Sequence, residues 1–177
     1  TVNATDNAGQ TSLHFACYHG HLDVSQWLQS AGATVDATND EGRSPLHHAC
    51  LQGHLDIAQW LWSAGASVDV TTSDGRTPLH STCLGIAQWL QSAGATINAT
   101  DNAGHTSLHF ACLDGHLDVA QWLHSVGATV NATDNEGYTP LCTACQRGHL
   151  DVAQWLHGAG ATVNATDNAG YTPLHFA

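Results

Sequence analysis

The sequence repeats itself with a period of 33 residues, and this regularity limits the fold more than any other feature. Glycine marks the period at Gly9, Gly42, Gly75, Gly104, Gly137 and Gly170, and only the interval from Gly75 to Gly104 is shorter, at 29 residues. The approximate repeats are 6–38, 39–71, 72–100 (shortened by four residues), 101–133, 134–166 and a partial 167–177. We interpret residues 1–177 as a single domain, and because it begins and ends inside a repeat we expect a longer parent protein.

Each full repeat carries the local signals of two short helices and a loop. Thr77 and Pro78 suit the start of a first helix, because threonine caps free backbone amides and proline is tolerated in the first turn. The pair Gly53-His54 suits its end, since glycine readily adopts the left-handed backbone of a helix terminus. Residues 55–61 have apolar side chains at helical spacing, and residues 131–137 have the composition of a turn. We therefore expect a helix pair followed by a projecting hairpin loop.

The core is expected to form between repeats, because one short helix pair cannot bury its own apolar side. Tryptophan and cysteine each recur once per repeat, at Trp27, Trp60, Trp89, Trp122, Trp155 and at Cys17, Cys50, Cys83, Cys112, Cys145. We predict that both sets are buried, and that Trp122→Ala costs roughly 3–5 kcal/mol. The third repeat lacks about one helical turn between its helices, so we expect shortened helices and a weaker junction there.

Several motifs at fixed offsets closely resemble the ankyrin repeat. These are Thr-Pro-Leu-His at 77–80, its serine variants at 44–47 and 106–109, the Gly-His pairs, and Gly-Ala-Thr-Val-Asn at 127–131. The resemblance covers essentially the whole chain. It implies an all-α, right-handed solenoid of antiparallel helix pairs with projecting β-hairpin loops. It also implies a protein-binding module that uses the hairpin tips and the concave face of the first helices.

The charge of the chain excludes several classes of partner. There are 15 acidic residues, three arginines and no lysine, which gives a formal net charge of -12. Binding to nucleic acid or to an anionic membrane depends on Lys and Arg, so neither is expected. No apolar run approaches the roughly 18 residues of a membrane span. We expect a monomer in the cytoplasm or nucleus, with a basic or neutral protein segment as its partner.

The abundant cysteines and histidines raise the question of a metal site. Pairs such as His47/Cys50, and the Cys142-Thr143-Ala144-Cys145 segment, have ligand-like spacing. They are better explained as repeated structural positions, because zinc needs about four converging ligands and these pairs lie in separate repeats. Cys142 stands where other repeats carry histidine, and so lacks the hydrogen bonds of an imidazole. We predict no metal, cofactor, disulfide or catalytic residue. Asn98, Asn131 and Asn164 resemble acceptors of an intracellular asparaginyl hydroxylase, with stabilisation of the loops as the alternative.

Positions that vary between repeats are free of the stacking constraint and are our candidates for partner contact. They follow the loop glycine, end the first helix or form the loop tips: Gln10, Tyr18, His19, Asp40, Glu41, Arg43, Leu51, Gln52, Asp74, Arg76, Leu84, His105, Leu113, Asp114, Tyr138, Gln146, Arg147 and Tyr171. Tyrosine and arginine are favoured at binding hot spots. We expect a groove with Arg43 and Arg76 beside an apolar strip of Leu51, Leu84 and Leu113. The alternatives are a passive spacer or self-associating scaffold, and a substrate-recognition adaptor of a ubiquitin ligase.

Overall fold

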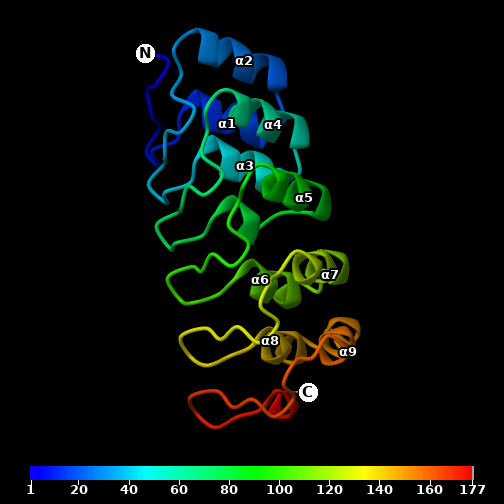
Figure 1. Ribbon diagram of the computed structural model, residues 1–177. Helices are drawn as coiled ribbons and strands as arrows, with labels where there is room; N and C mark the ends of the chain where they lie inside the picture. Colours follow the sequence, from blue (N-terminus) through cyan, green and yellow to red (C-terminus); the bar gives the residue numbers. More distant parts are fainter. Residues whose placement is uncertain (177) are drawn as a thin grey trace. The chain divides into compact units, whose positions relative to one another are not determined.

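The computed structural model describes residues 1–176, which fall into two compact units: residues 1–96, and residue 97 onward. Both units consist of short helices joined by loops (Figure 1). The described residues contain no β-strand, only isolated bridges between Thr5 and Thr11 and between Thr100 and Thr106. The all-α prediction is therefore confirmed, and the hairpins are loops rather than paired strands.

The first unit contains two complete helix pairs and a third, incomplete one. Its helices are α1 (Ser12–Tyr18), α2 (Leu22–Ser30), α3 (Pro45–Gln52), α4 (Leu55–Ser63) and α5 (Leu84–Ser92), with a single 3-10 turn η1 at Pro78–His80. Its loops project on the side away from α4 and α5 (Figure 1). As predicted, Gly53 ends α3 in the left-handed conformation, with φ of 82°.

The second unit repeats the same arrangement. It contains α6 (Ser107–Leu113), α7 (Leu117–Ser125), α8 (Pro140–Arg147), α9 (Leu150–Gly158) and a 3-10 turn η2 (Pro173–His175). Its loops project on the side away from α7 and α9 (Figure 1). Within each unit, consecutive first helices pack on one another and on their own second helix, as stacked helix pairs require.

The core consists of leucine, isoleucine and alanine, and the prediction of a tryptophan core is wrong. In α4, Ile57, Ala58 and Leu61 are fully buried, whereas Trp60 is only half-buried. A helix turns by about 100° per residue, so Trp60 lies roughly 105° from the centre of that buried face. Trp27 is 64% exposed. The tryptophans therefore flank the stack rather than fill it, which overturns the large cost predicted for Trp122→Ala.

The missing turn of the third repeat shortens one helix and not the other. The first helix is reduced to η1, while α5 keeps the nine residues of the other second helices. Cys83, expected to be buried like Cys17, Cys50 and Cys112, is instead exposed as the residue that precedes α5. Leu84 is the first residue of α5, so it does not occupy the end of a first helix as predicted.

Candidate functional site

Histidines inside the stack fix the position of each loop relative to the helix before it. The backbone N–H of Ser44 donates to Nδ1 of His47 (3.1 Å), and Nε2 of His47 donates to the carbonyl oxygen of Arg76 (3.1 Å) in the next repeat. His14 reaches Arg43 and His109 reaches Tyr138 in the same way, at 3.0 and 3.2 Å. Because the carbonyl only accepts and Nδ1 of each ring accepts a backbone N–H, each ring is neutral with its proton on Nε2. Burial lowers the pKa of all three rings, that of His47 to about 4.

Further hydrogen bonds, within each loop and between successive loops, fix the backbone at the residue that follows each loop glycine. One carboxylate or amide oxygen accepts two backbone N–H groups of its loop, as Asn39 does from Glu41 (3.1 Å) and Arg43 (2.9 Å). The amide of Ser73 also donates to the carbonyl of Glu41 in the preceding loop, at 2.9 Å. A Cβ atom on Gly42 would lie 2.6 Å from that amide nitrogen, so only glycine permits the approach. Arg43 and its equivalents therefore project from a rigid base.

None of the predicted contact residues is buried. Eleven of them are exposed, and the other seven, half-buried, are Gln10, Arg43, Arg76, Leu84, His105, Leu113 and Tyr138. We predicted that the variable positions are free of the stacking between repeats, and their exposure agrees with that prediction.

In the first unit, four predicted residues line one hollow of about 50 Å³. Arg43, Leu51, Asp74 and Arg76 surround it, together with His47, Thr72, Thr77, Pro78 and Ser81. Nε of Arg43 lies 3.2 Å from Oε2 of Glu41, and Nε of Arg76 lies 3.1 Å from Oδ2 of Asp74. Sequence reasoning found the arginines and Leu51 but missed Pro78 and Ser81. Leu84 is not part of its lining.

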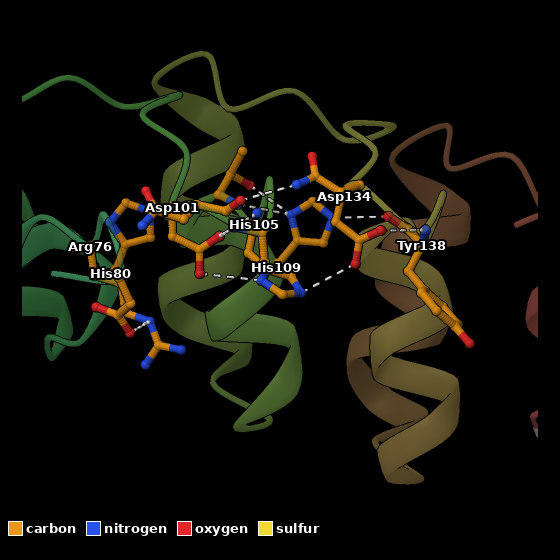
Figure 2. Close-up of polar contacts among 12 residues, drawn as sticks. Arg76, His80, Asp101, His105, His109, Asp134 and Tyr138 are labelled. Carbon is orange, nitrogen blue, oxygen red and sulfur yellow. Dashed lines mark hydrogen bonds and ion pairs between the residues drawn. The ribbon is translucent and has the colours of Figure 1, made fainter. Parts of the chain in front are cut away.

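In the second unit, His105 bridges two carboxylates of successive loops (Figure 2). Its Nδ1 lies 3.2 Å from Oδ2 of Asp101, and its Nε2 lies 3.2 Å from Oδ2 of Asp134. Burial works to raise the pKa of Asp101, but hydrogen bonds from the backbone and ring of His105 outweigh it, and the pKa is lowered. Part of the His105 surface is thus used to hold the second unit together.

An aromatic cluster occupies the loop side of the second unit near its last described residues. The ring of Phe176 lies 5.6 Å from that of Tyr138 and 6.0 Å from that of Tyr171. Sequence reasoning selected both tyrosines and missed Phe176. Phenylalanine at the equivalent positions of two other repeats, Phe15 and Phe110, could have indicated it. The cluster offers the amphipathic aromatic surface that protein interfaces favour.

The asparagines considered for hydroxylation have a structural role in two cases. Nδ2 of Asn98 donates to the carbonyl of Gly127 (3.0 Å), and its Oδ1 accepts from the amide of Thr129 (3.0 Å). Asn131 makes the same pair of bonds to Gly160 and Thr162. All three asparagines, including Asn164, are exposed. The loop-stabilising alternative therefore accounts for Asn98 and Asn131.

Burial also affects the cysteine thiols. Cys17 and Cys112 are buried, and burial raises the pKa of both thiols to about 12. Throughout residues 1–176 the cysteines are free thiols, and no group of three His, Cys, Asp or Glu side chains is arranged to hold a metal ion. Over the same residues, no helix is long and apolar enough to cross a membrane.

Stacked helix pairs joined by projecting loops define a helical-repeat protein. A family model described as ankyrin repeats matches three overlapping stretches, residues 1–72, 64–134 and 108–177. The chain therefore belongs to the ankyrin repeat family, whose members are generally protein–protein interaction modules. A comparison with curated proteins found no match.

Proposed function

We propose that this chain is a protein-interaction scaffold that binds a segment of a partner protein along the loop tips and the exposed ends of its first helices. The observation that carries the proposal is the hollow of the first unit, where residues chosen only for their variability meet as one surface. The aromatic cluster of Tyr138, Tyr171 and Phe176 supports it in the second unit. No catalytic group is assigned to the chain.

The charge of the loops favours a basic or neutral partner segment. Asp74 lines the hollow and Glu41 pairs with Arg43, both acids are exposed, and the net charge of the whole chain is -12. Like charges across an interface are unfavourable and opposite charges accelerate association. A nucleic acid or an anionic membrane would meet the same repulsion, so neither is proposed as a partner.

The experiment is quantitative affinity capture from source cells with three baits: the wild type, a surface triple variant and a matched control. The triple variant carries Arg76→Ala, Leu113→Ala and Tyr138→Ala. The control carries Gln59→Ala, Gln88→Ala and Gln121→Ala, which are exposed positions on second helices. A partner captured by the wild type and the control but lost from the triple variant supports the proposal, provided that circular dichroism shows equal helicity. Equal capture by all three baits contradicts the placement of the site.

The rival functions give different results in the same set of experiments. In light scattering, a self-associating scaffold would have a mass above that of a monomer. We propose a monomer, with a mass of 18.6 kDa. A passive spacer would capture no partner on this surface. A ubiquitin-ligase adaptor would co-purify with ligase subunits, and the absence of lysine is the only feature that favours it. Localisation in the cytoplasm or nucleus, hydroxylation of Asn98, Asn131 or Asn164, and a single domain over residues 1–177 stay as proposals.

A further inference from the structure

We infer that the hollow of the first unit receives one carboxylate side chain from a partner segment that is otherwise neutral or basic. This inference rests on the proposed function and adds the chemistry of a single contact. It concerns the hollow lined by Arg43, Leu51, Arg76, Pro78 and Ser81.

Cationic side chains are concentrated at this hollow. The chain has only three arginines and no lysine, and two of the three line the same small space. Arg43 and Arg76 occupy the same loop position in successive repeats, and their side chains are 43% and 40% exposed. A guanidinium group is planar and binds a carboxylate through two parallel N–H groups. The location therefore selects an anionic group, in contrast to the rest of the chain.

The size of the hollow indicates a small group rather than a ring. Its volume of about 50 Å³ accommodates a carboxylate but not an aromatic side chain. Leu51 is 48% exposed and, with Pro78, provides an apolar wall for the methylene groups of a glutamate. Ser81, which lines the hollow, stands where the first and fourth repeats have the larger side chains of Phe15 and Phe110.

The neighbouring acids limit the partner to one carboxylate at this place. Glu41 and Asp74 pair with Nε of Arg43 and Arg76, and these acids are 65% and 55% exposed. Exposed ion pairs are weak, so a partner carboxylate can share the guanidinium groups with them. A segment with several acids would meet Glu41 and Asp74 and be repelled. A segment with one acidic side chain among neutral or basic residues can bind the arginines without strong repulsion from the neighbouring acids.

The test uses the full chain and pools of short random peptides of defined charge. One pool contains a single glutamate per peptide, a second has glutamine in its place, and a third has three glutamates. A fourth, unrestricted pool measures peptide binding as such. We expect the single-glutamate pool to bind roughly tenfold more tightly than the glutamine pool, since a charge-assisted hydrogen bond contributes about that factor. The three-glutamate pool is expected to bind worst.

Variants separate this contact from the general charge of the chain. Arg43→Gln should abolish the preference for glutamate over glutamine. Gln88→Glu, on the exposed face of α5, lowers the net charge by the same amount and should preserve that preference. Peptides that bind with no preference for glutamate, or a preference that survives Arg43→Gln, would overturn the inference and leave the proposed function standing. If no pool binds and capture from cells also fails, the proposed function itself is wrong.

Discussion

Two adjacent histidines of α3 should respond to the same substitution with opposite sign. His47 and His48 are both buried, at 8% and 5% exposure. His47 uses both ring nitrogens, for Ser44 and for the carbonyl of Arg76, whereas among the described residues neither ring nitrogen of His48 has a hydrogen-bond partner. An unsatisfied buried polar atom costs about 1–3 kcal/mol. We therefore predict that His48→Phe stabilises the protein and His47→Phe destabilises it.

The magnitude for His48→Phe follows from its surroundings. Its ring packs edge-on against His14 at 5.6 Å and Tyr18 at 5.7 Å, contacts that a phenylalanine ring can keep. Phenylalanine also occupies the equivalent position in Phe15 and Phe110, so the fold accepts it there. Two unsatisfied nitrogens cost about 2–6 kcal/mol together, so after allowing about 1 kcal/mol for the altered shape we expect a net gain of about 1–5 kcal/mol at pH 7.5.

The pH dependence gives a second, independent readout. Burial lowers the pKa of His48 to about 4, from its ordinary value of 6.5 in the unfolded chain. Between these values the unfolded state binds more protons, so His48 makes the wild type less stable as the pH falls from 6.5 towards 4. Removing it should increase the gain by about 2 kcal/mol at pH 5 relative to pH 7.5.

The assay is urea-induced unfolding followed by circular dichroism at pH 7.5 and pH 5. His47→Phe serves as the matched control at pH 7.5, with an expected loss of about 2–6 kcal/mol from two unsatisfied backbone groups. If His48→Phe is neutral or destabilising at both pH values, the ring of His48 is hydrogen-bonded in solution and the reasoning is refuted.

Three further predictions test the packing. Cys142→His should raise the free energy of unfolding by about 1 kcal/mol, because the new ring can bridge Thr139 and the carbonyl of Tyr171 as the other histidines do; an unchanged urea midpoint would show that the last repeat gains nothing. Leu123→Ala should cost about 2–5 kcal/mol and Trp122→Ala only about 1–2, because Leu123 is 1% exposed and Trp122 is half-buried; equal losses would restore the tryptophans to the core. Cys83 should react with iodoacetamide in the native protein while Cys17, Cys50, Cys112 and Cys142 are protected, as peptide mass spectrometry would show; uniform labelling would mean that the third repeat is not folded as described.

The repeat pattern was sufficient to predict the helix pairs, their ends and the family. A fixed period combined with Thr-Pro starts and Gly-His ends leaves few other folds, and the structure has its helices at those places. The period alone did not predict which side of each second helix faces the core. Trp60 and Leu61 recur equally often, yet only the three-dimensional packing decides which of them faces the neighbouring helices.

The sequence predicted several residues of the candidate site but not the hollow that they form. Variation between repeats selected Arg43, Leu51 and Arg76, because side chains that do not stack are free to differ. The hollow also includes Pro78 and Ser81 of the third repeat, which the variation between repeats did not select. The sequence suggested that both helices of this repeat would shorten, whereas only the first is reduced, to η1, and Leu84 begins α5.

The central claim is that a partner binds the loop tips and first-helix ends while the second helices stay free. Hydrogen–deuterium exchange of the full chain, with and without the captured partner, tests this claim directly. The account predicts slower exchange at the loop amides around Arg43 and Arg76 and at the end of α3, with no change in α4 and α5. Protection confined to α4 and α5, with the loops unaffected, would contradict it.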